Sequence, residues 1–242
     1  MKHRLDLHIH TCLSPCGDWS MSAAAIANMA KHMHLDIIAV TDHNSIANIP
    51  AVADACHLMG IEVISGIEIQ TKEEVHLLGY FPDFKTISEF YLEFEKYLPF
   101  IKCNPDKMGS QIVIDKNDEV VREEEKFLGV SSSLSVEQTI DLIHKHKGIA
   151  FASHVDRKAF SIISQLGFIP DGMKFDGIEI YNSDMPYREK YPVICSSDAH
   201  YIDEIGKRYS SFSMDKCHEG RGFEIFKEAL EKRLIECHKG GL

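Results

Sequence analysis

The sequence has no long apolar run and no leader-like amino terminus. None of its apolar stretches approaches the roughly 18 consecutive residues that a membrane-spanning helix needs. The amino terminus passes at once into a strand-like run and offers no signal peptide. We therefore expect a protein without a membrane span and, by default, a cytoplasmic location.

Positive charge is also scarce. The chain has 26 lysines and arginines against 37 aspartates and glutamates, which gives a formal net charge of -11. A protein that binds a long stretch of nucleic acid needs a basic surface, so extended nucleic-acid binding is not expected. A small anionic substrate is compatible with this charge, because bound metal ions reverse the local field.

The cysteines follow no regular pattern. The 7 cysteines are an odd number at irregular spacing, which predicts reduced thiols rather than a disulfide framework. Cys12 and Cys16 could form a redox pair, but their spacing differs from the usual Cys-x-x-Cys. No repeat and no linker divides the 242 residues, so a single domain is expected over residues 1–242.

Apolar, β-branched runs alternate with amphipathic stretches along the chain. The runs are nearly continuous, which is typical of parallel strands that are covered on both faces. Repeated strand-then-helix units predict either an α/β barrel or a doubly wound sheet. The expected strands are Arg4–His8, Asp36–Thr41, Ile61–Ile67, Val75–Phe81, Ile149–Ala152, Gly177–Tyr181 and Val193–Ser196. The expected helices are Ser22–His32, Ile49–Met59, Ser135–His146 and Phe223–Arg233.

One segment, residues 82–135, interrupts this alternation. It contains a helical pattern at Ser88–Leu98 and an acidic run at Glu123–Glu125. The segment is too long for a simple connection. It predicts either a lid or small subdomain over the functional site, or a peripheral insertion without a catalytic part, and the sequence leaves both open.

Histidines and acids gather where the expected strands end. His8 and His10 alternate with apolar residues, so their side chains point the same way. A hairpin would bring Glu68 and His76 together across two antiparallel strands, which departs from a strictly parallel barrel. Metal-ligating side chains at five strand ends predict a metal site. The clusters are Asp6-His8-His10, Asp42-His43, Glu68 with His76, Ser153-His154 and Asp198-His200.

This combination resembles the PHP (polymerase and histidinol phosphatase) domain family. The resemblance covers the chain apart from the middle segment and the tail after about Lys207. It implies a distorted seven-stranded (β/α) barrel with up to three metal ions at its mouth. The inserted lid or small subdomain is expected from the middle segment itself. The matching motifs are Asp6-x-His8-x-His10, Thr41-Asp42-His43, Gly66-x-Glu68, His76, His154 and Ser197-Asp198-x-His200.

The resemblance also implies three ligand sets. The first is His8, His10, Glu68 and Asp198; in the second, Glu68 bridges to His76 and His154; the third is Asp18, His43 and His200. Such mixed nitrogen and oxygen donors suit two to three Zn, Mn or Fe ions better than Mg or Ca. At the third site Cys16 is an alternative to Asp18, because thiolates bind zinc well. Asp6 and Asp42 are expected to orient imidazoles.

The expected activity is hydrolysis of a small phosphomonoester, such as a sugar, nucleotide or amino-alcohol phosphate. A hydroxide that bridges two metals would attack phosphorus. Asp198 or His200 could also assist proton transfer, while Arg157 and Arg208 are candidates to bind the phosphate. The alternatives are C–N hydrolysis of the amidohydrolase type, exonuclease action on a short oligonucleotide, and a non-catalytic metal-binding module. The sequence predicts neither the native metal nor the oligomeric state.

Overall fold

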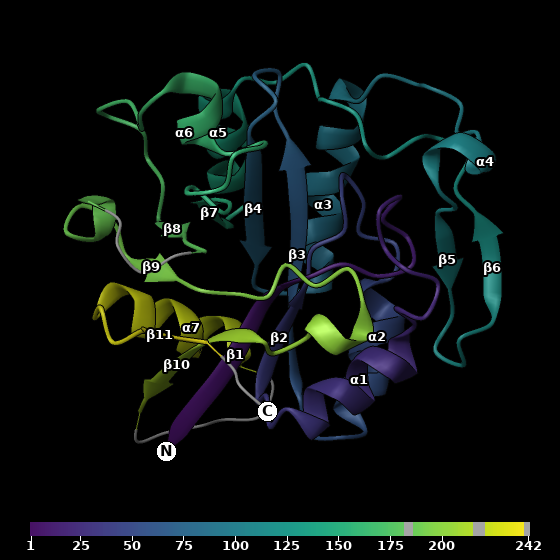
Figure 1. Cartoon of the computed structure of the whole chain (residues 1–242), viewed down its shortest axis with the longest axis horizontal. Coiled ribbons are helices and arrows are strands. Elements are labelled where there is room, and N and C mark those ends of the chain that lie inside the picture. Colours follow the sequence, from purple (N-terminus) through teal and green to yellow (C-terminus); the bar gives the residue numbers. More distant parts are fainter. Residues whose placement is uncertain (182–185, 215–220, 240–242) are drawn as a thin grey trace.

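The principal element of the computed structural model is a nine-stranded sheet, in the order β11-β10-β1-β2-β3-β4-β7-β8-β9 (Figure 1). The structure describes residues 1–181, 186–214 and 221–239. A separate two-stranded sheet pairs β5 (Ile112–Ile114) with β6 (Val120–Glu123). The strands of the large sheet are β1 (Lys2–Ile9), β2 (Ile37–Val40), β3 (Glu62–Gln70), β4 (His76–Phe81), β7 (Ile149–Ala152), β8 (Gly177–Glu179), β9 (Val193–Ile194), β10 (Arg208–Ser213) and β11 (Glu236–Lys239).

The strands of the large sheet other than β10 and β11 close into a barrel at one end. The N–H of His10 donates to the carbonyl of Ala199 at 3.0 Å, and the N–H of Ala199 donates to the carbonyl of His8 at 3.2 Å. This bridge joins the segment after β9 to the end of β1. The expected α/β barrel is confirmed as a class, although the sheet has nine strands rather than seven. The strands of the barrel wall are β1, β2, β3, β4, β7, β8 and β9.

Two further strands extend the sheet beyond the barrel. β10 pairs antiparallel with β1, and β11 pairs antiparallel with β10. Both strands were missing from the sequence prediction. Their sequences, RYSSFS and ECHK, are too polar to read as buried strands.

One strand of the barrel runs against the others. β1, β2 and β3 are parallel, and so are β7, β8 and β9, but β4 is antiparallel to both β3 and β7. The predicted hairpin is therefore confirmed, with Gln70 opposite His76 in its register. Because β4 is inverted, its first residue, His76, lies at the same mouth as the carboxyl ends of its neighbours.

A bulge in β1 aims two histidines into the barrel. The pairing of β1 with β2 shifts register between Asp6 and Ile9. Strict alternation would place His8 on the opposite face from Leu7, which packs in the inner core of the barrel. We infer that the bulge brings His8 and His10 onto the inner face, where both contact Glu68.

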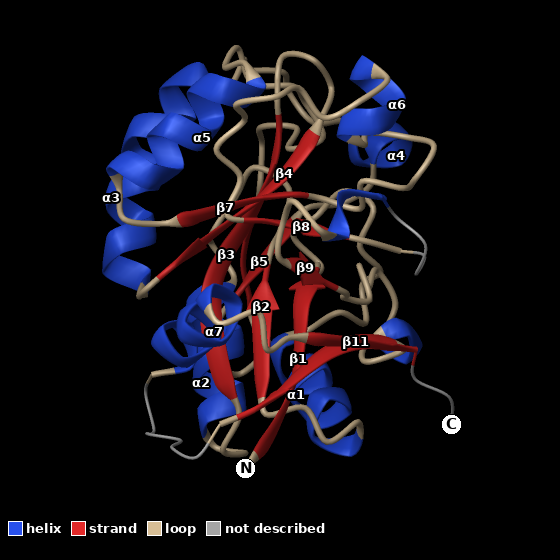
Figure 2. Cartoon of the chain, turned by 90° about the vertical axis from the view of Figure 1, so that its left-hand side faces the viewer, coloured by secondary structure: helices blue, strands red, loops and turns tan. Residues whose placement is uncertain are grey.

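Helices cover the outside of the barrel and one of its ends. α3 and α5 pack side by side against the outer face (Figure 2), where Phe90 of α3 lies 4.7 Å from Phe81 of β4. Phe226 of α7 packs with the inner core. The helices are α1 (Ala23–His32), α2 (Ile49–His57), α3 (Phe84–Phe94), α4 (Pro105–Met108), α5 (Val136–Lys145), α6 (Ile162–Leu166) and α7 (Gly222–Glu231), with 3₁₀ turns at Glu95–Tyr97, Pro186–Arg188 and Ile202–Glu204. Within the described residues, no helix is long and apolar enough to cross a membrane.

Several helix starts follow from local sequence. Ser135 begins α5 with a capping box: its Oγ accepts from the N–H of Gln138 at 3.2 Å, and Gln138 Oε1 accepts from the N–H of Ser135 at 2.9 Å. Ser22 and Asp83 accept from the backbone at the starts of α1 and α3 in the same way. These caps fix where each helix begins; those of α1 and α5 follow loops at the barrel mouth, whereas Asp83 follows the far end of the inverted strand β4.

The middle segment divides into two parts. Residues 84–94 form α3 and belong to the helical layer of the barrel. The part that contains α4, β5 and β6 lies beside the loops after β1 and β2 (Figure 1). There the side chain of Asn48 binds the backbone of Ile112 and Ile114, and Asn44 Nδ2 donates to two carbonyls near residue 130. This part therefore supports loops that carry site residues; its action as a lid stays a prediction.

Candidate metal centre at the barrel mouth

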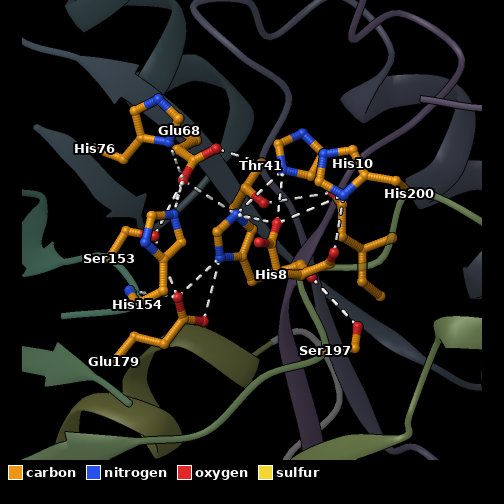
Figure 3. Close-up of polar contacts among 12 residues, drawn as sticks. His8, His10, Thr41, Glu68, His76, Ser153, His154, Glu179, Ser197 and His200 are labelled. Atoms are coloured by element: carbon orange, nitrogen blue, oxygen red, sulfur yellow. Dashed lines mark hydrogen bonds and ion pairs between the residues drawn. The ribbon is translucent and has the colours of Figure 1, made fainter. Parts of the chain in front are cut away.

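Glu68 stands at the centre of the barrel mouth (Figure 3). Burial alone would raise the pKa of Glu68, but the surrounding histidines His76, His8 and His43 outweigh burial and hold this pKa well below its usual range. Its carboxylate therefore stays ionised among imidazoles. The histidine nitrogens within 3.1–3.4 Å of its oxygens belong to His8, His10, His43, His76 and His154.

Three groups of side chains have the geometry of metal ligands. In each group, one donor atom from every residue lies within 4.8 Å of the others. The groups are His8, His10 and Asp198; His43, Glu68 and His76; and His10, His43 and His200. His154 joins them through Glu68, at 3.4 Å. The structure thus brings together eight of the nine side chains that the sequence proposed as ligands; the ninth, Asp18, lies apart.

The tautomers of His8 and His10 are fixed by their outer partners. His8 Nδ1 lies 3.0 Å from the carboxylate of Glu179, so Nδ1 carries the proton. The hydroxyl of Ser14 donates to Asp42 at 2.7 Å, so it accepts from His10 Nδ1 at 2.9 Å. In the neutral forms of both rings, the two Nε2 atoms face each other with lone pairs, 3.1 Å apart. Facing lone pairs repel unless a cation lies between them, so this donor set fits a metal ion.

The charges around these histidines favour a cation. Burial lowers the pKa of His10, but hydrogen bonds with Asp198 and Glu68 outweigh burial and raise it to about 9. Burial and the neighbouring His10 lower the pKa of His200 to about 4. The mouth therefore stabilises positive charge between its carboxylates and keeps a neutral imidazole at its edge. Neutral imidazole and carboxylate are the forms in which these side chains bind metals.

A cavity of about 240 Å³ opens above these donors. Arg157 lies on its wall and forms an ion pair with Asp198. Phe160 stacks on His76 at 4.7 Å and forms another part of the wall. Arg208 does not line this cavity; it donates to the carbonyl of Tyr181 and stacks on that ring at 3.4 Å. The two arginines proposed for phosphate binding are thus placed differently, one in the cavity and one beyond Tyr181.

The profile of the PHP domain family matches residues 6–169. This range includes six of the eight ligand positions that the structure brings together, all except Asp198 and His200. The chain belongs to the PHP domain family. The resemblance inferred from the motifs is thereby confirmed, and with it membership of a family of metal-dependent hydrolases of the phosphoesterase type. The match also spans the middle segment and ends between α6 and β8.

Relatives place this PHP domain in a diverse family. It is 33% identical over 82 residues to a 5′-3′ exoribonuclease of Haemophilus influenzae, covering 33% of this chain and 29% of that protein. It is 24% identical over 188 residues to the uncharacterized protein MJ1587 of Methanocaldococcus jannaschii, covering 74% of this chain and 82% of that protein. The similarity thus spans less than a third of the exoribonuclease.

Solved structures share the fold. The lesion-specific endonuclease PfuEndoQ of Pyrococcus furiosus superposes with a TM-score of 0.71 at 19% identity, over 96% of this chain and 56% of that chain. A structure of endonuclease Q in complex with a 27-mer duplex that has an abasic lesion gives a TM-score of 0.72 at 19% identity, over 96% of this chain and 57% of that chain. At this identity the likeness shows the fold alone.

The loop that carries Asp198 is held by Asp6. The carboxylate of Asp6 accepts from the N–H groups of Ser197 at 2.9 Å and Gly206 at 2.8 Å. Asp6 therefore acts on the backbone and does not orient an imidazole as expected, whereas Asp42 does so through Ser14. Asp198 has a φ of 54°, a left-handed backbone conformation that costs energy for a residue other than glycine. The anchored backbone of Ser197 holds this turn in place.

Glu179 is a functional residue that the sequence analysis missed. It is buried at the end of β8, and its carboxylate accepts from Ser153 Oγ at 3.2 Å and from the N–H of His154 at 3.0 Å, in addition to His8 Nδ1. Glu179 thereby fixes two predicted metal ligands at once. The signal in the sequence was a single acid inside the apolar run Gly177–Tyr181.

We expect the substitution Glu179→Gln to weaken metal binding by about 10–100-fold, the usual cost of losing the outer partner of a metal-bound histidine. Glutamine keeps the shape but loses the charge, and its N–H₂ group no longer accepts from His8. A chelator-competition titration measures the change. Glu224→Gln, at an exposed position of α7, is the matched control. Equal metal affinity in both variants would contradict the role of Glu179.

Asp18 and Cys16 occupy different places at the edge of the site. The carboxylate of Asp18 accepts from Ser20, at 2.9 Å from its N–H and 2.6 Å from its hydroxyl. The backbone N–H of Asp18 donates to the carbonyl of His200 at 2.9 Å, so the loop itself is tied to the site. Cys16, but not Asp18, lines the cavity beside His43. Which of the two completes a third metal site stays a prediction.

Proposed function

We propose that this PHP domain is a phosphoesterase that uses two to three divalent ions of Zn, Mn or Fe to hydrolyse a phosphomonoester. The observation that carries this proposal is the position of Arg157, whose guanidinium lies on the wall of the cavity beside Asp198 and the histidine donors. A fixed arginine next to metal ligands matches the needs of an anionic phosphoryl group. Amide hydrolysis has no such need for a cation.

Different residues of the chain have different roles in such a reaction. Divalent metals in this donor set supply Lewis acidity and lower the pKa of water. Arg157 offers a planar fork of N–H donors, one part of which Asp198 already orients, and the rest can bind phosphate oxygens. His200 Nδ1 lies 2.9 Å from the carbonyl of Asp198, which leaves its Nε2 lone pair to bind a metal or accept a proton. Phe160 stacks on His76 and gives the cavity an apolar wall.

A second candidate is hydrolysis of a phosphodiester at the end of a nucleic acid. It is favoured by the sequence similarity to the Haemophilus influenzae exoribonuclease, which covers 33% of this chain. The formal net charge of -11 argues against contact with a long polyanion. A short end that enters the cavity needs few contacts, so the two candidates differ in what is attached to the phosphate rather than in the chemistry at the metals.

Turnover of phosphorylated substrates by the metal-loaded protein and its Arg157 variants tests the proposal. Arg157→Ala is expected to lower kcat/KM for a phosphomonoester by roughly 10²-fold, as the loss of one preorganised donor to the transition state does. Arg157→Lys should recover part of this loss, because the charge remains without the fork. Arg122→Ala, which removes an exposed ion pair on β6, is the control. Hydrolysis of amides but of no phosphomonoester would refute the proposal.

A further inference from the structure

A second cavity, of about 200 Å³, lies beyond Tyr181 and is rich in positive charge. We call it the basic pocket. Among the described residues, its lining contains three permanent cations and no carboxylate. Arg188 and Lys239 are exposed, and Arg208 is half-buried. The lining residues are Tyr181, Arg188, Cys195, Arg208, Cys237, His238 and Lys239.

The cations of the basic pocket lack carboxylate partners in the described part of the chain. Neighbouring lysines are neutralised: Lys190 pairs with Asp171 at 2.7 Å, and Lys207 pairs with Asp203 at 2.8 Å. No such ion pair is found for the three cations of the pocket among residues 1–181, 186–214 and 221–239. In a chain with a net charge of -11, this is a local excess of positive charge. Such an excess attracts a small anion.

One aromatic ring separates the basic pocket from the metal centre. The guanidinium carbon of Arg208 lies 3.4 Å from the ring centroid of Tyr181, and that of Arg157 lies 4.7 Å from the same centroid. Arg157 belongs to the metal cavity and Arg208 to the basic pocket. The N–H of Tyr181 donates to Asp156 at 2.6 Å, which holds its backbone. The two cavities are therefore neighbours joined by stacked side chains.

The floor of the basic pocket is continuous with the metal-ligand loop. Ser210 Oγ donates to the carbonyl of Cys195 at 2.9 Å and accepts from the N–H of Cys195 at 2.9 Å. Cys195 precedes Asp198 by three residues, and Ser210 also pairs with Cys237 in the sheet. This framework fixes the pocket relative to the metal centre.

We propose that the basic pocket is an anion subsite that holds a second, non-reacting phosphate of the substrate whose first phosphate lies at the metals. This inference rests on the proposed function and narrows its substrate class to molecules with at least two phosphates. Arg188 and Arg208 offer forked donors, and Lys239 offers a point charge. Both a small bisphosphate and the phosphorylated end of an oligonucleotide have this chemistry.

Binding of α,ω-alkane bisphosphonates of increasing chain length to the metal-loaded protein tests the subsite without turnover. The best-fitting bisphosphonate should bind at least about tenfold more tightly than the alkyl monophosphonate of equal length, which corresponds to one good charge-assisted contact. In the double variant Arg188→Gln/Lys239→Gln this advantage should vanish. The matched control Lys145→Gln/Lys174→Gln removes the same amount of charge elsewhere on the protein. It should keep the affinity advantage of the bisphosphonate. An advantage that survives in the double variant, or is absent from the natural sequence, overturns the subsite.

Kinetics on three substrates separates the sources of the second phosphate. The ratio of kcat/KM for a two-phosphate substrate to that for p-nitrophenyl phosphate should fall about tenfold in Arg188→Gln/Lys239→Gln, mainly through KM. If this ratio falls for a nucleoside 3′,5′-bisphosphate, the subsite binds the second phosphate of a small ligand. If it falls for a 5′-phosphorylated trinucleotide, the subsite binds the end of an oligonucleotide. An equal loss on p-nitrophenyl phosphate overturns the subsite. If no substrate is hydrolysed, the proposed function fails, while the phosphonate titration still decides the subsite.

Discussion

Glu68→Gln is expected to reduce turnover by the metal-loaded protein by roughly 10³-fold, equivalent to about 4 kcal/mol of lost charge stabilisation. No other described side chain contacts as many of the candidate ligands: the oxygens of Glu68 lie within 3.4 Å of nitrogens from five histidines. Glutamine has almost the same volume, so the barrel can still pack around it. It removes the negative charge, however, and replaces an acceptor oxygen with a donor that points at imidazoles.

The measurement pairs turnover with metal content, determined by elemental analysis of the purified protein. Glu74→Gln is the matched control, because Glu74 is exposed on the turn that joins the same two strands. The control should keep full activity and metal. A Glu68→Gln protein that turns over normally with a full complement of metal would show that Glu68 is not a bridging ligand.

The position of Glu68 illustrates what the sequence could predict. The strand of Glu68 is a continuous apolar run, and a turn precedes His76 at the position that a hairpin requires. Glu68 and His76 could therefore be assigned to the same end of the barrel from the sequence. The same reasoning placed His43 and Asp198 at the ends of β2 and β9. Strand ends converge in any barrel, but periodicity also allowed a doubly wound sheet, so this part of the site depended on the family resemblance as well.

The remaining features depend on geometry that periodicity does not encode. The bulge in β1 changes the face on which His8 lies, and no residue type marks it. Glu179 reads as an isolated acid until the barrel closes and brings it to His8. Arg157 and Arg208 look equivalent in the sequence, and only the path of the loops puts Tyr181 between them. Long-range contacts of this kind are set by tertiary structure.

Removal of the metals by a chelator is expected to lower the melting temperature, and the loss should grow as the pH rises from about 6.5 to 9. A metal that binds only the folded chain adds RT ln(1 + [L]/Kd), about 4 kcal/mol at a thousandfold excess over Kd. In the metal-free protein, hydrogen bonds with Asp198 and Glu68 outweigh burial and raise the pKa of His10 from 6.5 to about 9. A raised histidine pKa stabilises the fold below 6.5, and this stabilisation is lost as the pH rises through 9.

The metal-loaded protein responds in the opposite direction. Metal binding displaces protons from imidazoles, so the metal affinity rises with pH while the proton-supported stability of the metal-free protein falls. Titrating groups outside the metal cluster cancel in the comparison. His144, whose pKa is raised by its hydrogen bond with Asp176, is such a group and titrates alike in both forms. The difference in melting temperature between loaded and chelated protein, measured at each pH, therefore reports the barrel mouth. A difference that stays constant or shrinks toward pH 9 would mean that the cation does not replace a proton between His10 and the carboxylates.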